Sequence, residues 1–413
     1  MSPQALSILS DLTMAFRNVV RHRRRAGFAL LIIAGGVLAF LLSGGFIHWL
    51  LDNMREGFIH SQVGHIQVVR PNYFEVGVAD PYRYLLPENS DAEKAVRSTE
   101  HVVTMSSRLS FSGLASFKDQ TITFMGEGVD SEAEKQVSRD ITLVAGEALS
   151  SSDPTGVLLG RGLAANLGVK VGDTLVLMTS TAKGGMNASD VHVRGLFSTF
   201  SKEYDDGALR VPVGLSRELM RVKGATTWVV LLDDTANTAK SLQALRDKLD
   251  PKQFQLVPWE ELADMYIKTR DLFLRQVFIV EMLIGLIIVL SIGNTLHMAV
   301  VERTGEIGTA MALGVRRRHI LRLFIFEGLV LGTIGGFVGV SLGWSLSILI
   351  SWIGIPMPPP PGMEDGFDAE LLVDAGLAFN AFVLAVVTTV CASILPAFNA
   401  SRMNIVDALR HQR

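Results

Sequence analysis

The residue types that most often carry out chemistry do not gather into a recognisable site in this chain. Four histidines lie in its polar region: His60, His65, His101 and His192. They lack the i, i+4 spacing and the acidic partners of a zinc or acid–base site. No GxSxG sequence indicates a nucleophilic serine, no GxxxxGKS/T sequence indicates a phosphate-binding loop, and the single cysteine, Cys391, excludes an internal disulfide. We therefore expect no catalytic residue and no metal site, and we interpret the chain as non-enzymatic.

One short segment combines charged and apolar residues at helical spacing. Glu302 and Glu306 are four residues apart, and the apolar Ile307, Met311 and Leu313 follow them. If these three side chains face a partner, the segment could dock as a short helix into another protein. A basic loop that anchors the chain at a membrane surface explains the same residues equally well. The residues alone leave both interpretations open.

Composition indicates a membrane protein, because 48% of the 413 residues are hydrophobic and the mean hydropathy is +0.33. The net charge of −3 excludes a generally basic nucleic-acid-binding protein. The uncharged residues 26–51 would form a helix of about 39 Å, against a hydrocarbon core of roughly 30 Å. Similar stretches occupy residues 277–301, 323–353 and 377–398. A cleaved signal peptide is the alternative for the first stretch, but its apolar core would have only about 7–15 residues.

Arginine placement predicts the orientation of these four spans. Basic residues precede the first span, separate the second from the third, and follow the fourth: Arg17, Arg21, Arg23, Arg24, Arg25, Arg303, Arg316, Arg317, Arg318, Arg322, Arg402, Arg410 and Arg413. Residues 354–376 contain no Lys or Arg and five acids. Because Lys and Arg stay cytoplasmic, we expect residues 1–25, 302–322 and 399–413 in the cytoplasm. Residues 52–276 and 354–376 would then lie outside, in the periplasm of a cell with two membranes.

Residues 52–276 are too polar to span a membrane and alternate short apolar runs with turn residues, which favours a mixed α/β domain. We predict strands at residues 66–69, 121–125, 157–159, 174–178, 191–196, 209–213, 229–232 and 254–257, and helices at residues 91–97, 161–167, 216–222 and 238–249. Residues 50–59 and 259–275 continue the helical pattern of the adjoining spans and predict a stalk. The predicted fold class is an α-helical membrane protein with four transmembrane helices and a mixed α/β extracytoplasmic domain between helices 1 and 2.

The third span carries glycines in three overlapping GxxxG spacings: Gly332, Gly335, Gly336, Gly339 and Gly343. Small residues on a helix face allow close backbone approach, so we predict tight packing against another span. The sequence leaves open whether that span belongs to the same chain or to a second protein.

Two acids and a run of prolines lie at the ends of the spans. Glu281 and Glu327 could act as proton relays, or their positions at the span ends could simply let them reach the membrane–water interface.

Five prolines between residues 356 and 361 predict a stiff, extended connection. That connection is either a spacer or a lip at the outer membrane surface.

The segment between spans two and three fits the pattern ERT-x-EIG-x-x-x-A-x-G-x5-I. The matching residues are Glu302, Arg303, Thr304, Glu306, Ile307, Gly308, Ala312, Gly314 and Ile320, followed by Glu327 and Gly328. With this motif the chain resembles the FtsX-like permeases of the type VII, or mechanotransmission, ABC transporters, a family that includes macrolide-exporter-type proteins. Further matches are Pro396, Ala397, Ala400, Ser401, Arg402, Ala408, Leu409 and Arg410 at the C-terminal end. Phe16, Arg17 and Asn18 with residues 64–68 are most similar to the lipoprotein-releasing branch.

The resemblance implies that residues 302–322 form a coupling helix in a groove of a cytoplasmic ABC ATPase, present in two copies. ATP and Mg would bind that ATPase, and this chain would need no cofactor. Macrolide-exporter-type relatives carry the ATPase at the N-terminus, whereas about 25 residues precede span one here, so we expect a separate ATPase subunit. The other implied partners are a second permease, identical or paralogous, membrane lipid and a periplasmic carrier or adaptor, with no nucleic acid. The implied location is the bacterial inner membrane.

The resemblance further implies a permease that couples ATP hydrolysis to a periplasmic conformational change and extracts or moves lipoprotein, lipid or other amphipathic cargo. The alternative is a mechanotransmission permease that activates a periplasmic cell-wall hydrolase and transports nothing. A third interpretation is an ATP-independent sensor.

Overall fold

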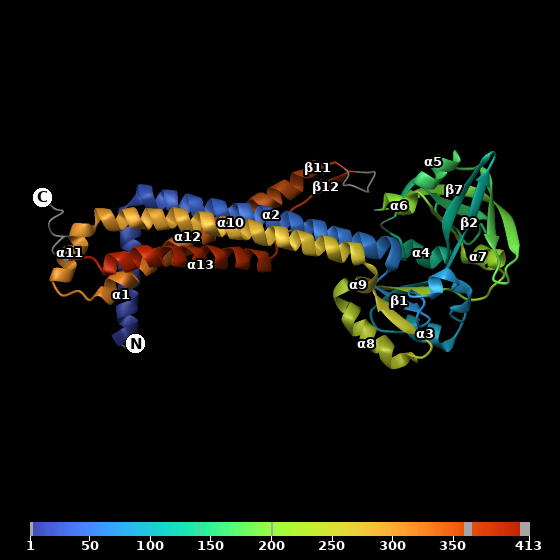
Figure 1. The fold of residues 1–413 in the computed structure, drawn as a ribbon, viewed down its shortest axis with the longest axis horizontal. Helices are drawn as coiled ribbons and strands as arrows, with labels where there is room; N and C mark the ends of the chain where they lie inside the picture. The colour runs from blue at the N-terminus through green and yellow to red at the C-terminus, as the bar shows by residue number, and fades with distance from the viewer. Residues whose placement is uncertain (1–2, 140, 200, 359–365, 405–413) are drawn as a thin grey trace. The chain divides into compact units, whose positions relative to one another are not determined.

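The computed structural model describes residues 3–139, 141–199, 201–358 and 366–404 of the chain. Its contacts separate two compact units (Figure 1). The helical unit comprises Met1–Asp52, Thr269–Met357 and Asp368–Arg413, and the sheet unit comprises Asn53–Lys268 and Pro358–Phe367. Residues 359–365, with three of the loop prolines, and residues 405–413, with the Ala408–Arg410 motif, lie outside the described part of the chain.

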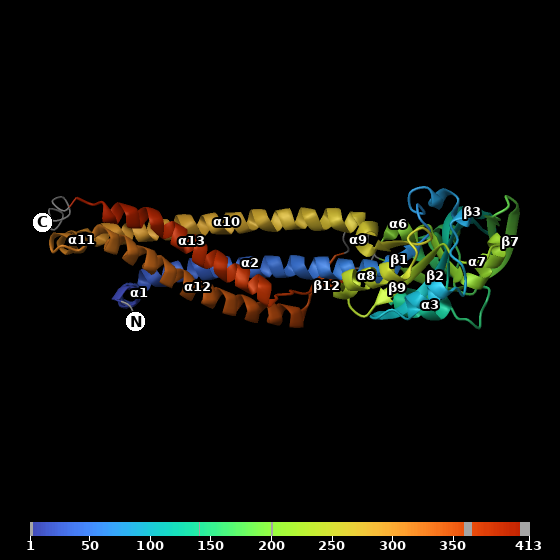
Figure 2. The same ribbon diagram turned by 90° about the horizontal axis from the view of Figure 1, so that it is seen from below.

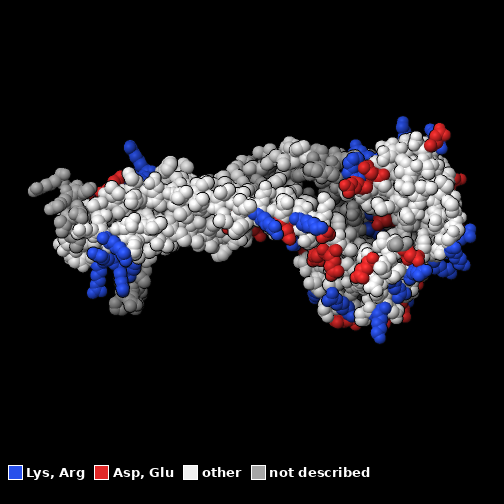
Figure 3. Space-filling view, in the orientation of Figure 1, with Lys and Arg blue, Asp and Glu red and all other residues white. Residues whose placement is uncertain are grey.

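Long helices make up the helical unit, and Figure 2 shows α2, α10, α12 and α13 running alongside one another. Their bounds are α2 Arg23–Phe58, α10 Asp264–Glu302, α12 Arg317–Ile353 and α13 Ala375–Ser401, with the short α11 Thr304–Ala312 between α10 and α12. The helix α1 Pro3–Arg21 precedes them and runs in a different direction (Figure 1). The helices α2, α10, α12 and α13 are each long and apolar enough to cross a membrane. In Figure 3 the middle of the helical unit shows almost no charge, and Lys and Arg gather over α1.

Glycines on two faces of α12 set the spacing within the helical unit. Gly332 and Gly336 face α13, whereas Gly335, Gly339 and Gly343 face α2. A Cβ at Gly332 would lie 2.1 Å from Thr389 Oγ1, and one at Gly339 would lie 2.7 Å from Val37 Cβ. The glycines therefore permit close contact with two helices of the same chain. The sequence had left open whether the partner span belongs to this chain or to a second protein.

Adding one methyl group at this contact is expected to push α12 and α13 apart. Gly332→Ala should lower the free energy of unfolding by about 1–3 kcal/mol, because the Cβ overlaps Thr389 and the backbone of α13. The matched control is Gly293→Ala in α10, whose Cβ would meet its nearest atom at an ordinary 3.7 Å. Thermal unfolding of the purified chain measures both, and equal midpoints would contradict the packing described here.

The sheet unit is built on one ten-stranded mixed sheet in the order β10-β1-β9-β2-β3-β8-β5-β7-β4, with β6 paired to β2 and β7. The strands are β1 Ile66–Val69, β2 Val102–Phe117, β3 Gln120–Val129, β4 Thr142–Gly146, β5 Gly156–Gly160, β6 Thr174–Ser180, β7 Met186–Ser198, β8 Ala208–Pro212, β9 Thr227–Leu232 and β10 Gln255–Pro258. The helices are α3 Asp91–Arg97, α4 Ser131–Val137, α5 Arg161–Leu167, α6 Lys202–Asp205, α7 Val213–Met220, α8 Thr238–Lys248 and α9 Trp259–Leu262. Shorter pieces of this unit are the π-helix η1 Ile59–Val63 and the 3₁₀-helices η2 Gly77–Ala79, η3 Pro81–Arg83 and η4 Thr235–Asn237. A separate two-stranded sheet, β11 Ile355–Met357 with β12 Phe367–Ala369, lies between α12 and α13 in the sequence.

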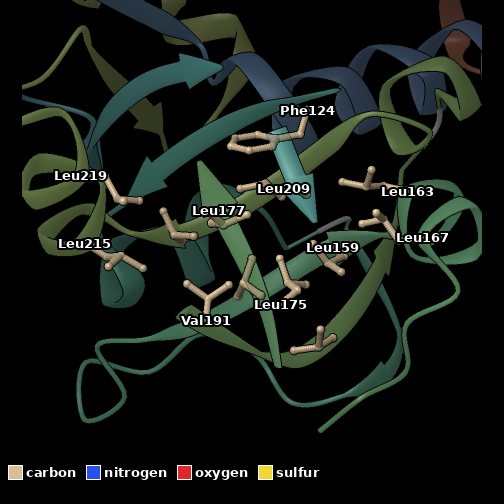
Figure 4. Packing of buried hydrophobic residues seen from close by; sticks show 14 of the residues in the cluster. Phe124, Leu159, Leu163, Leu167, Leu175, Leu177, Val191, Leu209, Leu215 and Leu219 are labelled. Carbon is tan, nitrogen blue, oxygen red and sulfur yellow. The ribbon is translucent and has the colours of Figure 1, made fainter. Parts of the chain in front are cut away.

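Two hydrophobic cores flank this sheet, and the long strand β2 contributes to both. One core gathers Phe124, Leu163, Leu177 and neighbouring side chains (Figure 4). The other surrounds Trp228, which stacks on Phe254 at 5.7 Å between ring centroids. The four apolar helices and this mixed α/β domain between the first two of them confirm the predicted fold class. One detail differs, because α9 ends at Leu262 and α10 begins at Asp264, so the helix predicted at residues 259–275 is two helices.

A buried carboxylate attaches α4 to the sheet. Arg108 Nη2 on β2 lies 2.6 Å from Glu134 Oε1, and Arg210 Nη1 on β8 lies 3.1 Å from the same oxygen. Burial alone would raise the pKa of Glu134, but the charges of Arg108 and Arg210 outweigh it and lower this pKa to about 2. All three groups therefore remain charged, and α4 is held over β2 and β8.

His65 joins the start of β1 to the end of β9. Its Nδ1 accepts a hydrogen bond of 3.1 Å from the Leu232 N–H, and its Nε2 lies 3.0 Å from Thr235 Oγ1. Its carbonyl accepts the Trp259 N–H at 3.0 Å. Burial, followed by the charge of His60, lowers the pKa of His65 to about 4, so the ring is neutral near pH 7.

This neutral histidine should make the sheet unit sensitive to acid. An unfolded His has a pKa of about 6.5, so the unfolded chain binds the proton more tightly than the folded chain. The contribution of His65 to the free energy of unfolding should be at its full value above pH 6.5, and the free energy should fall by about 2–3 kcal/mol as the pH drops towards 4. Thermal unfolding at pH 7.5 and 4.5 measures this. His65→Asn, which keeps an acceptor for the Leu232 N–H but does not titrate, should lose much of the pH dependence; an unchanged pH dependence would refute the assignment.

Candidate functional site

The site is the helical turn α11 and the residues that hold it between α10 and α12. α10 ends at Glu302, and Thr304 Oγ1 lies 2.7 Å from Val301 O and 3.1 Å from Val300 O, two of the last carbonyls of α10. α11 ends at Ala312, and Gly314, two residues later, has a φ of +95°, which glycine adopts at little cost. The Val315 N–H then bonds to Ala310 O at 3.1 Å, so the chain turns sharply into α12.

The inner face of α11 packs on its own chain. Ile307 and Met311 are 8% and 7% exposed and contact a cluster formed by α12 and α13. The cluster is completed by Val300, Ile320, Phe324, Ala397 and Ala400. The expectation that Ile307 and Met311 face a partner is therefore wrong, since helical spacing defines a face but not its surroundings.

The outer face of α11 is left to solvent. Leu313 is 82% exposed, whereas Met311, two residues before it, is buried. Of the residues predicted for coupling, Glu302, Glu306, Ala312 and Gly314 are exposed, Arg303 and Thr304 are half-buried, and Ile307 and Gly308 are buried. The exposed Arg316, Arg317 and Arg318 follow at the start of α12. The exposed surface thus has the apolar Leu313 between the acidic Glu306 and the three arginines at residues 316–318.

Glu327 of α12 is the buried charge that the sequence did not connect to α11. It is 3% exposed, and its Oε1 accepts from Arg303 Nη1 at 2.9 Å and from Asn18 Nδ2 of α1 at 2.8 Å. Arg303 is the residue immediately before α11. An ion pair explains the burial of Glu327 without a proton relay. An acid at the end of a span predicts a cationic partner, but the sequence does not say which cation, and Arg303 is 24 residues from Glu327 along the chain.

Two further ion pairs connect helices at the same end of the helical unit. Arg25 of α2 pairs with Glu302 at the end of α10. Asp11 of α1 is 1% exposed and lies 2.8 Å from Arg322 Nη2 on α12. A cavity of about 40 Å³ adjoins Asn18, Arg303 and Glu327, which is room for a water molecule or a small rearrangement. Three ion pairs thus connect α1, α2, α10 and α12 at the α11 end of the helical unit.

Two family models match the chain. Residues 26–248 match the MacB-like periplasmic core domain, more than half of the chain, and residues 278–405 match the FtsX-like permease C-terminal domain. The second match contains the whole of α11 and Glu327.

Whole-chain and partial relatives agree with these matches. An uncharacterized ABC transporter permease of Methanocaldococcus jannaschii is 22% identical over 428 residues, covering 98% of this chain and 99% of that protein. The macrolide export ATP-binding/permease protein MacB of Brucella abortus is 36% identical over 174 residues, which are 42% of this chain and 24% of MacB. The solved periplasmic region of MacB from Actinobacillus actinomycetemcomitans is 16% identical, with a TM-score of 0.37 over 49% of this chain and 93% of that one. The chain thus aligns with about a quarter of the length of MacB.

Removing the charge of Glu327 tests whether its ion pair with Arg303 holds α11 in place. Glu327→Gln leaves Arg303 without a counter-charge, so we expect the free energy of unfolding to fall by about 3 kcal/mol and amide exchange in α11 to accelerate. Glu302→Gln is the control, because that side chain is half-exposed and its pair with Arg25 should contribute less than about 1 kcal/mol. Hydrogen exchange of residues 304–312 in both variants decides it; equal acceleration would mean that Glu327 does not hold α11.

Proposed function

Because the chain belongs to the MacB-like and FtsX-like permeases of ABC transporters, we propose that it is the membrane subunit that passes the work of a cytoplasmic ATPase to its own outer domain. The observation that carries the proposal is the two-sided construction of α11. Its inner face is packed on α12 and α13, and its outer face presents Leu313 and Glu306 to solvent. A helix attached to the spans on one side and unoccupied on the other is suited to receive a partner.

The connection from this site to the sheet unit supports the same function. α10 is one helix of 39 residues, about 58 Å long, that begins six residues after Pro258, the end of β10, and ends next to α11. A continuous helix transmits a displacement along its axis with little loss. Glu327 joins α12 to the turn where α10 meets α11, so a push on α11 acts on both helices.

The proposed ATPase is a separate polypeptide that binds ATP and Mg, with two copies serving a pair of permeases. The proposed topology places α11 and both termini in the cytoplasm of a bacterial inner-membrane protein and the sheet unit in the periplasm. The exposed Arg17, Arg21 and Arg316–318 favour the cytoplasmic side of the membrane for α1 and α11. The second permease is a copy of this chain or a paralogue.

The proposed cargo is amphipathic: a lipoprotein, a lipid or a hydrophobic small molecule, received by a periplasmic carrier or adaptor. Cells depleted of the chain should accumulate that cargo in the membrane. Normal lipoprotein and lipid release with altered cell-wall hydrolysis would instead favour a permease that signals to a hydrolase.

Docking through the outer face of α11 is tested by charge changes that leave its inner face intact. Leu313→Asp and Glu306→Lys should each reduce the ATPase that co-purifies with the chain at least tenfold, because both side chains are exposed at the proposed contact. The matched control is Val171→Asp in the sheet unit, where an apolar side chain 41% exposed receives the same charge. Wild-type amounts of bound ATPase in both α11 variants would exclude this face as the docking site.

A further inference from the structure

A cavity of about 550 Å³ lies within the sheet unit where η1, the end of β9 and α9 meet. That volume is in the range that holds a small molecule or the head of a larger one. The side chains around it include His60, His65, Thr235, Trp259 and Arg139. His60 belongs to η1, a π-helix, and this rare geometry often occurs where a helix is adapted to a functional site.

A directed series of hydrogen bonds connects the two histidines. His65 Nδ1 accepts from a backbone N–H, so the ring proton is on Nε2 and is donated to Thr235 Oγ1 at 3.0 Å. The Thr235 hydroxyl must then donate to Glu56 Oε1, which is 2.9 Å away. The other oxygen of Glu56 faces His60 Nε2 at 3.5 Å, so this ring nitrogen is directed at a carboxylate. The second ring nitrogen of His60, Nδ1, is left without a partner.

Two buried polar atoms of this cavity have no partner. They are the ring nitrogen His60 Nδ1 and the donor Trp259 Nε1–H, and their side chains are only 4% and 6% exposed. Buried polar atoms are nearly always hydrogen-bonded, so two unpaired polar atoms lining one cavity favour a ligand that can both donate and accept. His60 and His65 rings lie 5.7 Å apart, although the sequence alone showed no site here.

The charged groups around the cavity are already paired. Arg55 lies 3.0 Å from Glu56, Asp233 lies 2.9 Å from His101, and Asp234 accepts the Ala236 N–H at 2.8 Å. Within the described ranges, no three His, Cys, Asp or Glu side chains are arranged as metal ligands. An ionic ligand or a metal would compete with these pairs, whereas an uncharged ligand would leave them intact.

We propose that this cavity binds the uncharged, hydroxyl-bearing head of a small polyol or of a lipid that carries one. A hydroxyl group both donates and accepts, so neighbouring hydroxyls satisfy His60 Nδ1 and Trp259 Nε1 together. Leu231, Leu232 and Ala236 supply an apolar wall for the carbon atoms of the ligand. This inference names a ligand beyond the proposed function, and its binding requires no ATPase.

Calorimetric titration of the full chain in phosphatidylcholine nanodiscs, without ATPase, tests this. The probes are 1-monooctanoylglycerol, methyl octanoate, which has an equally long acyl chain but no hydroxyl, and free glycerol. We expect saturable binding of monooctanoylglycerol with one site per chain, at least tenfold tighter than methyl octanoate. Competition by glycerol would identify a free polyol as sufficient, and its failure to compete would identify the lipid-linked head. Equal binding of the two esters, or no saturable binding, would overturn the proposal.

Variants locate the site. Trp259→Phe keeps a ring against Tyr266 but removes the N–H, and His60→Gln keeps a donor for Glu56 but removes the unpaired ring nitrogen Nδ1. Each should weaken monooctanoylglycerol binding at least tenfold. Trp352→Phe, at an 84% exposed position of α12, should bind like the wild type. Thermal unfolding shows which variants fold, and wild-type affinity in either folded cavity variant would refute the site.

Discussion

The carboxylate of Glu327 is the constraint on which the α11 end of the helical unit depends. An acid that is 3% exposed is tolerable only with a counter-charge, and Arg303, the residue immediately before α11, supplies it. Asn18 brings α1 to the same oxygen. The position of α11 is therefore not that of a free surface loop, because moving it requires that Glu327 move with it or exchange partners.

The remainder of the helical unit has little freedom to absorb such a movement. The glycines of α12 place its backbone against α2 on one face and α13 on the other, close enough that a methyl group would not fit at Gly332. Helices in such contact move together or separate at a cost. The ion pairs at one end and the glycine contacts along the length thus hold α11, α12 and their neighbours together.

Hydropathy and alternation of apolar residues predicted the spans and most of the outer domain, because burial in a bilayer or a sheet leaves a strong local pattern. The strand at residues 66–69 and the helices at residues 91–97 and 161–167 have the observed bounds. The central strand β2 was missed because five serines and Gly113 interrupt its apolar alternation, and β4 and α4 were missed with it. Long-range pairs such as Arg303 with Glu327 leave no local pattern. The meeting of His60 and His65 depends on a π-helix that a 3.6-residue period does not describe.

We propose that force enters at α11 and reaches the sheet unit through the helices that Glu327 joins. Hydrogen exchange of the reconstituted permease–ATPase complex, with and without ATP, can be compared between the wild type and Glu327→Gln. We expect ATP to change exchange in η1 and α9 of the wild type, and Glu327→Gln to abolish this change while the ATPase remains bound. No effect of ATP on exchange in the sheet unit of the wild type, or an equal effect in Glu327→Gln, would contradict this mechanism.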